Sequence, residues 1–483
     1  MTRRQPCPPA PGPLEAYAQQ FDDAFGHVGQ RRSFRAYLQG LLLPRERNKT
    51  LTGLAGVEPI LGAQAPPAQR LQWFLAESSW DAKAINARRL ELLRADPATR
   101  PHDGGVLILD ETGDRKDGTK TAHVAHQYLG SVGRIANGIV AVTSVWADED
   151  VYHPLHVLPY TPAARLPKGK QDPALRTKPQ LAVALVDAAV EAGFAFRAVV
   201  ADCLYGEHPA MQTALWDGAI PYVMALRGRS AHWAPPDRPQ SPQAAARLTP
   251  WAGPAAPGGW TAVVRRFRDG HRETWWAVDL TLHGMAPDHE LRLVAVTTDP
   301  ATLPADSTWY LLTNLPHPDA PHALTSPIPA ADLAEIVRLY GLRTWVEQSY
   351  KQVKQELGWA DWQVRRDAAI RRHWVLVCCA FSFCWWAWSR TPDGPPPVER
   401  ELAPPTAPPG AWPASALRST RPNVAWPVAL RRVQAWLYPW TLLRRWWRGR
   451  GPPPRPRHSS RRSSTGSGWG YRWIATPGSN KLP

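Results

Sequence analysis

Apolar residues near the start of the chain recur at the spacing of helices. Between residues 14 and 93 the apolar positions follow a helical period, and glycine and proline separate the runs, which predicts a small domain of four or five helices. Residues 1–13 are rich in proline and are expected to be disordered. Basic residues surround the second predicted helix, and they fit either contacts with DNA or the solvated rim of a helix bundle. These residues are Arg31, Arg32, Arg35, Arg45, Arg47 and Lys49.

Short, continuously apolar runs follow and predict a sheet. Residues 106–109 form such a run, which is typical of a strand buried on both faces, and the run ends at Asp110. Residues 198–201 form a second run of this kind, which ends at Asp202. Further strands are predicted over residues 138–146, 152–160 and 222–228, and a helix is predicted over residues 180–192.

The two aspartates point to a shared site. In open α/β sheets the ligand site lies outside the carboxyl ends of the strands, so Asp110 and Asp202 converge if their strands are neighbours. Each aspartate alone could equally be a turn residue or a helix cap. The placement of both at the end of a buried strand favours the shared site.

The pattern changes between residues 228 and 325. A proline-rich loop leads into a hairpin with an Asp269-Gly270 turn, and further strands are predicted over residues 291–299 and 308–315. We therefore expect a β-rich insertion. Its tryptophans are expected to fill a small core, although one of them could instead stack on an unpaired base. They are Trp260, Trp275, Trp276 and Trp309.

An amphipathic helix is predicted over residues 339–362, with Gly358 as its stop. On a helical wheel its apolar side chains fall within about 40° of one another and form a packing seam. A second stripe lies roughly 90° away and contains Tyr340, Arg343, Glu347 and Lys354. Taken alone, such a stripe is typical of a solvated flank with an i,i+4 ion pair.

The chain then predicts a buried helix over residues 364–388. Its most apolar part, residues 374–388, is too short to span a bilayer comfortably, so we expect no membrane segment. A proline-rich linker follows, and residues 429–451 interleave arginine with tryptophan on expected helices. This combination suits contacts with phosphates and bases, but also a helix that packs its aromatic face on the core.

The charge is concentrated at the end of the chain. Of a net charge of +16, residues 391–483 carry +12, with 15 basic and 3 acidic residues. A nearly neutral body with a strongly basic end favours a nucleic-acid partner over a merely solubilising tail. Five cysteines without a CxxC pair, and no secretory signal, predict a reduced, cytoplasmic protein associated with the nucleoid.

Three carboxylates, Asp110, Asp202 and Glu347, are the candidate catalytic residues. Oxygen ligands of this kind favour Mg²⁺ or Mn²⁺, and two such ions can activate a water or a 3′-hydroxyl for phosphoryl transfer. Arg343 and Lys354, on the stripe of Glu347, are placed to neutralise the phosphodiester. The sequence holds no nucleophile elbow, P-loop or dinucleotide fingerprint, so acyl transfer, nucleotide hydrolysis and hydride transfer have no support.

The spacing Tyr340–(2)–Arg343–(3)–Glu347–(6)–Lys354 resembles the Tyr-Arg-Glu-Lys signature of a large group of bacterial insertion-sequence transposases. Residues 109–138 and 199–206 resemble the first- and second-aspartate regions of a DDE-superfamily endonuclease family in that group. Residues 345–365 are similar to its glutamate helix, and residues 37–50 and 71–82 are similar to its start.

This resemblance implies a ribonuclease-H-like fold with Asp110, Asp202 and Glu347 as the metal-binding triad. It also implies cleavage of the element's ends, strand transfer into target DNA, and a homodimer that holds the two ends. We expect contacts to DNA from Tyr340, Arg343, Lys351 and Lys354, although Tyr340 suits packing equally well. Two features depart from the family: Glu111 stands where many relatives have a second aspartate, and the chain after about residue 451 does not resemble the family's ending.

The sequence thus predicts a DDE transposase that acts on terminal inverted repeats and target DNA. The alternatives are an inactive remnant that regulates by binding DNA, and a repair nuclease on the same fold. The expected fold class is α/β, with a mixed sheet flanked by helices and interrupted by a β insertion. The expected domains are a disordered start (1–13), a helical domain in contact with DNA (14–100), a catalytic core (101–227 and 326–390), the insertion (228–325), and a linker with a basic end (391–483).

Overall fold

The computed structural model describes residues 13–58, 60–230, 238–267, 269–280, 291–390 and 425–449. Disorder was predicted for residues 1–13; residues 1–12 lie outside the described residues, and Pro13 is the first residue of helix α1. The proline-rich linker and the final tail also lie outside the described residues. Pro9–Thr441 form one compact unit, and the last helix from Leu442 onward belongs to a second unit. The domain boundaries proposed from the sequence stay predictions.

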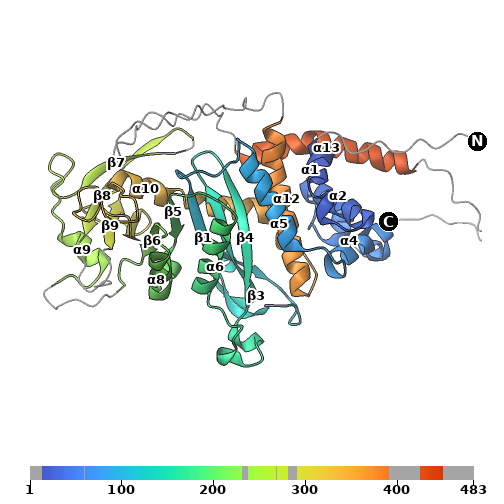
Figure 1. Cartoon of the computed structure of the whole chain (residues 1–483), viewed down its shortest axis with the longest axis horizontal. Helices are drawn as coiled ribbons and strands as arrows, with labels where there is room; N and C mark the ends of the chain where they lie inside the picture. Colours follow the sequence, from blue (N-terminus) through green and yellow to red (C-terminus); the bar gives the residue numbers. More distant parts are fainter. Residues whose placement is uncertain are drawn as a thin grey trace, which may run out of the picture. The chain divides into compact units, whose positions relative to one another are not determined.

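The predicted N-terminal helices form, and they pack around one long apolar helix, α12 (Asp367–Trp388) (Figure 1). Tyr37 places its hydroxyl 2.8 Å from Nδ1 of His373 in α12. The N-terminal helices and α12 therefore share one hydrophobic core. These helices are α1 (Pro13–Gln19), α2 (Val28–Leu42), α3 (Leu51–Ala55), α4 (Pro66–Ala76) and α5 (Ala82–Ala95).

Two of the basic residues around α2 form ion pairs or hydrogen bonds within the protein. Arg35 forms ion pairs of 2.7 Å with both Glu15 and Asp22. Lys49 is buried, and its ammonium donates to the carbonyls of Leu41 and Leu43 at the end of α2. Arg35 and Lys49 therefore have structural roles, and their presence does not require a contact with DNA.

The first part of α13 (Trp426–Gly449) packs on the core. The indole of Trp426 is fully buried, stacks on Phe381 at 4.5 Å and donates to its carbonyl. In this part of the Arg/Trp-rich segment, up to Thr441, the aromatic face thus serves packing.

The strands of the described residues form a single ten-stranded mixed sheet in the order β2-β3-β1-β5-β6-β10-β9-β8-β7, with β4 also paired to β3. Strands β1, β5 and β6 are parallel, and the remaining pairs are antiparallel. The strands are β1 (Val106–Arg115), β2 (Ala125–Leu129), β3 (Arg134–Ala147), β4 (Tyr152–Tyr160), β5 (Ala198–Ala201), β6 (Tyr222–Leu226), β7 (Thr261–Arg266), β8 (Arg272–Leu280), β9 (Arg292–Thr297) and β10 (Thr308–Thr313).

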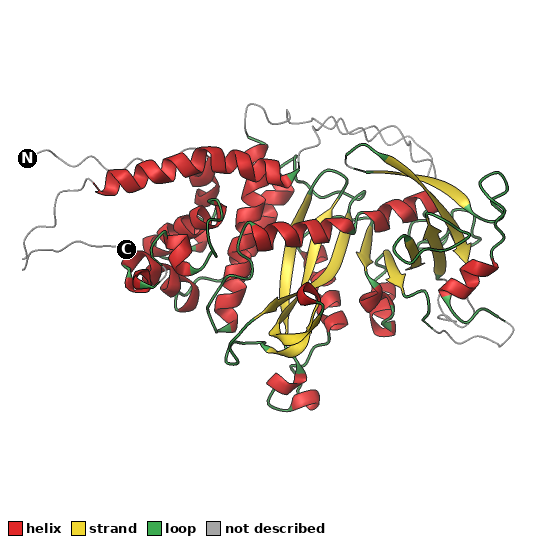
Figure 2. Cartoon of the chain, turned by 180° about the vertical axis from the view of Figure 1, so that it is seen from behind, coloured by secondary structure: helices red, strands yellow, loops and turns green. Residues whose placement is uncertain are grey.

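Helices cover both faces of this sheet, as expected for the predicted α/β class (Figure 2). One face packs on α6 (Lys178–Glu191) and α8 (Pro209–Asp217). The other packs on α10 (Leu333–Gly341), α11 (Thr344–Gln355) and α12. The short helices are α7 (Cys203–Gly206), α9 (Pro242–Leu248) and the 3₁₀ turns η1 (Asp22–Ala24), η2 (Leu61–Gln64), η3 (Gly130–Val132), η4 (Ala163–Arg165) and η5 (Gly169–Gln171).

The first strand is longer than the sequence predicts. We expected it to end at Asp110, but β1 continues to Arg115, so Asp110 lies in its middle. The reason is β3, which pairs with β1 along its whole length, from Val106↔Ala147 to Arg115↔Gly138. Strand β5, in contrast, pairs with β1 only as far as Leu109↔Ala201. The sheet therefore opens beside Asp110.

The predicted β-rich insertion forms β7 to β10, but these strands continue the main sheet because β10 pairs with β6. The predicted turn is present between β7 and β8, where Gly270 has a φ of +90°. The insertion's tryptophans pack on both faces of the sheet: Trp260 and Trp276 lie in one apolar core, and Trp275 and Trp309 in the other.

The predicted helix over residues 339–362 is in fact two helices, which is a correction to the helical wheel. Helix α10 ends at Gly341 and α11 begins at Thr344. Between them the backbone tightens to i→i+3 hydrogen bonds, from Arg343 to Tyr340 and from Trp345 to Leu342. Gly358 does stop the segment: its φ is +71°, and Trp359 donates back to Val353.

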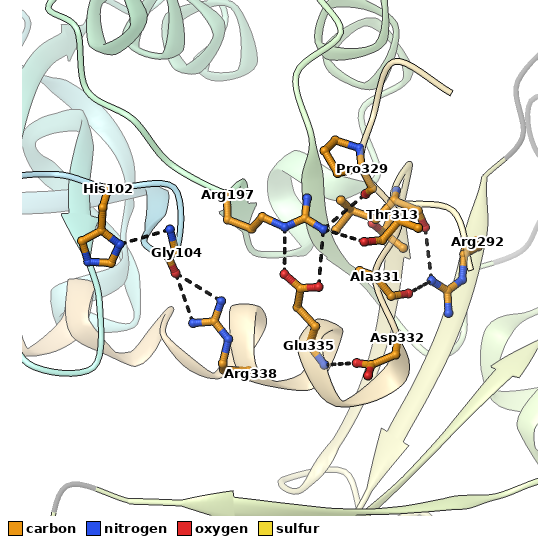
Figure 3. A network of polar contacts seen from close by, with 12 residues as sticks. His102, Gly104, Arg197, Arg292, Thr313, Pro329, Ala331, Asp332, Glu335 and Arg338 are labelled. Atoms are coloured by element: carbon orange, nitrogen blue, oxygen red, sulfur yellow. Dashed lines mark hydrogen bonds and ion pairs between the residues drawn. The ribbon is translucent and has the colours of Figure 1, made fainter. Parts of the chain in front are cut away.

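A network of buried polar contacts fixes α10 (Figure 3). Arg197, which directly precedes β5, donates to Glu335 at 2.8 Å and to the carbonyl of Ala330 at 2.9 Å. Arg338 donates to the carbonyl of Gly104, just before β1. Asp332 caps the helix by accepting from the amide of Glu335. The first turn of α10, through Glu335, and its last turn, through Arg338, are thus tied to the starts of the two strands that carry the aspartates.

No helix within the described residues is long and apolar enough to cross a membrane. Helix α12 contains the most apolar stretch of the sequence, and it is buried in the core as expected. The four described cysteines, Cys203, Cys378, Cys379 and Cys384, are free thiols.

Candidate active site

Asp110 occupies the point where the sheet opens. Its side chain is 12% exposed, and one of its oxygens accepts from the amide of Glu111 at 2.7 Å. Burial raises the pKa of Asp110 to about 7, although the nearby Arg343 opposes this rise. A neighbouring cation therefore strongly stabilises the charged form of this carboxylate.

Asp202 comes directly after β5, beside Asp110 in the parallel register. It also caps α7, since its carboxylate accepts from the amide of Leu204 at 3.0 Å. Asp202 is therefore a helix cap, and its role as a site residue stays a prediction. The turn is tight because Gly206 lies against the carbonyl of Ala225 in β6, where a β-carbon would overlap it.

Glu347 lies in the first turn of α11, and its side chain is 66% exposed. The i,i+4 ion pair expected from the sequence is present, with 3.6 Å between Arg343 and Glu347. Helix α11 lies over β1, β3 and β4, and buried Val346 and Val353 pack on them.

Arg343 lies among all three carboxylates. Its guanidinium is 3.1 Å from Asp110, 3.9 Å from Asp202 and 3.6 Å from Glu347. Burial acts to lower the pKa of Arg343, but Asp110 and the other carboxylates raise it. The Nε atom is buried without a hydrogen-bond partner. The convergence that the sequence predicted is therefore present, with a side-chain cation at its centre.

The donor set suits a hard divalent cation, because all three side chains offer oxygen ligands. Within the described ranges, however, no group of three potential ligands is already close enough together to hold a metal ion. The carboxylates are spaced around a guanidinium, which is wider than a metal ion. For a divalent ion to be held by these carboxylates, Arg343 would have to leave the centre.

The other predicted contact residues are distributed around this cluster. Tyr340 lies on α10, only 9% exposed, with its ring 5.0 Å from that of Trp309, and burial raises its pKa to about 12. Lys354 pairs with Asp114 at 2.8 Å and donates to the carbonyl of Gly113. Lys351 is exposed on α11.

Glu111, the residue that departs from the family pattern, points away from the cluster. Successive side chains of a strand alternate between faces, and Glu111 forms an ion pair of 2.6 Å with Lys178 at the start of α6. The glutamate thus ties α6 to β1 behind the site.

Two polar contacts next to the site were not predicted from the sequence. The hydroxyl of Tyr350 lies 2.6 Å from that of Thr143, the β3 residue paired with Asp110. Asp114, the partner of Lys354, lies on the same face of β1 as Asp110. Period-2 alternation would have indicated Asp114 if the strand had been predicted to continue past Asp110.

The comparisons with known proteins agree with this geometry. The family described as DDE superfamily endonuclease matches residues 20–282. The chain is also 32% identical over 365 residues to a probable transposase for insertion sequence element IS701 from Microchaete diplosiphon, covering 75% of this chain and 85% of the relative. The chain belongs to the DDE superfamily endonucleases. It is a transposase of that superfamily, and a DNA-binding remnant without catalysis is not favoured.

The family match includes Asp110 and Asp202, whereas Glu347 lies beyond its last residue. Nucleases of this superfamily use divalent metal ions in general, in agreement with the oxygen-only donor set.

Gly206 offers a test of how α7 places Asp202. Gly206→Ala would force α7 away from β6, because the new methyl group overlaps the carbonyl of Ala225. We expect a lower melting temperature, by several degrees, and a loss of DNA cleavage. Gly118→Ala is the matched control, since nothing lies within 4 Å of its β-carbon position. Equal melting temperatures for the two variants would contradict this packing.

Proposed function

We propose that this transposase binds the terminal inverted repeats of an insertion sequence, cleaves phosphodiesters at the ends and joins them to target DNA. Asp110, Asp202 and Glu347 hold the Mg²⁺ or Mn²⁺ ions, two in number, in this proposal. When bound, such ions supply charge neutralisation and an activated oxygen nucleophile for in-line displacement. The observation that carries the proposal is that one guanidinium lies within 4 Å of all three carboxylates.

Arg343 has two successive partners in this proposal. Without metal and DNA its guanidinium lies among the three carboxylates and offsets part of their negative charge. Once divalent ions neutralise them, the guanidinium is free to turn to a phosphate of the DNA, which it can bind in a bidentate manner. The unpartnered Nε supports this, because the present arrangement does not use all its donors.

The two lysines of α11 extend this contact. Lys351 is exposed one helical turn after Glu347 and can reach a phosphate without breaking another interaction. Lys354 is held by Asp114, so its role in DNA binding requires an exchange of partners similar to that of Arg343. Tyr340 is largely buried against Trp309, which favours packing at the edge of the site over a direct contact.

The remaining assignments follow from the reaction. A homodimer is proposed because the two ends of the element must be held together for joining. The N-terminal helical region and the basic end of the chain are proposed to add contacts to the DNA backbone, and the protein is proposed to act in the cytoplasm at the nucleoid. The strongly basic end, with 15 basic against 3 acidic residues after residue 390, supports a polyanionic partner.

Glu347→Gln tests the catalytic assignment. We expect cleavage of element-end DNA in Mg²⁺ to fall by roughly 10²–10³-fold or more, because a charged oxygen ligand is lost while the shape is kept. Glu356→Gln is the matched control, since it makes the same change at the end of the same helix. The measurement is strand nicking on labelled duplexes. The proposal fails if Glu347→Gln nicks the ends as well as Glu356→Gln does.

Arg343→Gln tests whether the arginine substitutes for a metal ion. Without its positive charge the three carboxylates repel one another, so we expect a lower melting temperature than wild type in EDTA. Added Mn²⁺ should restore stability in the variant by more than it stabilises the wild type. Arg32→Gln, at an exposed position on α2, is the control. An unchanged melting temperature in EDTA would show that the guanidinium does not hold the cluster.

A further inference from the structure

The β2–β3 hairpin carries large apolar side chains in the open. Tyr128 on β2 is 55% exposed and Ile135 on β3 is 65% exposed. The two residues are directly opposite each other in the antiparallel register, so their side chains lie on the same face of the ribbon. Val132, in the turn between the strands, is 43% exposed. The tip of the hairpin thus presents an apolar patch to the surroundings.

The register places this patch on the catalytic face of the sheet. Asp110 pairs with Thr143 on β3, and the hydroxyl of Thr143 meets Tyr350 of α11 on that face. Every second residue of β3 back toward the hairpin shares this face, which includes the buried Ile139 and then the exposed Ile135. Helix α11 ends at Gln355. The face that holds the cluster therefore continues along β3, beneath α11 and past the buried Ile139, to the exposed residues of the hairpin.

The separation between patch and cluster suits a DNA duplex. Asp110 lies five residues before Arg115 on β1, and Arg115 pairs with Gly138 of β3. Ile135 precedes Gly138 by three residues, and because β3 is antiparallel to β1 these three residues extend the path in the same direction. At about 3.3 Å per residue the distance along the strands is roughly 26 Å. A base pair advances the duplex by about 3.4 Å, so this distance corresponds to roughly eight base pairs.

The charge of the hairpin also fits DNA. No aspartate or glutamate occurs in the sequence between Asp117 and Asp148. Lys120 and Arg134 are exposed in this stretch. Arg365 is exposed just before α12 and lies next to this stretch, because its carbonyl accepts from the amide of Ala122. An apolar patch with cations around it is suited to a groove bordered by phosphates.

We propose that the face formed by Tyr128, Val132 and Ile135 contacts duplex DNA about eight base pairs from the phosphodiester that is cleaved. The apolar side chains pack on sugars and base edges in the minor groove, and Lys120, Arg134 and Arg365 contact the flanking phosphates. This inference rests on the proposed function, because it takes the duplex to be the one that enters the Asp110–Asp202–Glu347 cluster.

The test uses duplexes of graded length. Element-end duplexes that extend about 4 or about 14 base pairs to either side of the cleavage point are labelled, and their affinity for the full chain is measured by fluorescence anisotropy in EDTA. The Tyr128→Ala/Ile135→Ala double variant should bind the longer duplexes about tenfold more weakly than wild type, a typical effect of losing such contacts. It should bind the shorter duplexes with unchanged affinity, because they do not reach the hairpin.

Leu248→Ala/Leu324→Ala is the matched control, because both leucines are exposed away from this face, at 70% and 97%. The control should bind every duplex as the wild type does, and the melting temperatures of both double variants should match that of the wild type. The proposal is overturned if the hairpin variant binds long and short duplexes with wild-type affinity. It is also overturned if light scattering shows that the variant dissociates a dimer in the absence of DNA, since the patch is then an interface between two copies.

Failure of the proposed function gives a different result. In that case wild type and Glu347→Gln nick element ends equally, whatever the affinity of the hairpin variant. Length-dependent weakening of binding without a change in nicking of short duplexes supports the hairpin contact alone.

Discussion

Three carboxylates gathered at one site repel one another, and a cation among them relieves that repulsion. In this protein the guanidinium of Arg343 is that cation, at 3.1 to 3.9 Å from Asp110, Asp202 and Glu347. The surrounding structure serves this gathering: the parallel register of β1 and β5 brings the aspartates together, and the turn between α10 and α11 turns Arg343 toward them. The same pocket then suits divalent ions, which is the chemistry that this superfamily of endonucleases uses.

The unequal lengths of the central strands determine where this pocket lies. Because β5 ends at Ala201 while β3 accompanies β1 to its end, one edge of β1 is free from Asp110 onward. Helix α11 covers the first part of that face, and the β2–β3 hairpin continues it into solvent. Helix α10 is tied at its first turn through Arg197 to the chain just before β5, and at its last turn through Arg338 to the chain just before β1. The glutamate helix α11 follows directly after it. The candidate catalytic cluster and the proposed DNA contact thus lie on the same face of the sheet.

Much of the site could be predicted because its signals are local. Buried strands have continuous apolar runs, and the runs before Asp110 and Asp202 were sufficient to place each aspartate next to a buried strand. That the two strands are neighbours is known only from the structure. The turn at Leu342–Arg343 was not predicted, because a helical wheel assumes a continuous helix and the amphipathic pattern survives the bend. The engagement of Arg343 with three carboxylates, the burial of Lys49 and the continuation of the sheet through β10 depend on residues far apart in sequence, for which a single chain carries no local signal.

The most direct test of the central claim is to map the metal site on the protein itself. In the complex with element-end DNA, Fe²⁺ replaces Mg²⁺, and ascorbate with peroxide then generates radicals that cut the backbone next to the bound ion. Our account predicts cuts close to Asp110, Asp202 and Glu347, with all three suppressed by excess Mg²⁺ and weakened together in Asp202→Asn. Cuts that cluster elsewhere in the chain, or cuts at these positions that excess Mg²⁺ does not suppress, would contradict it.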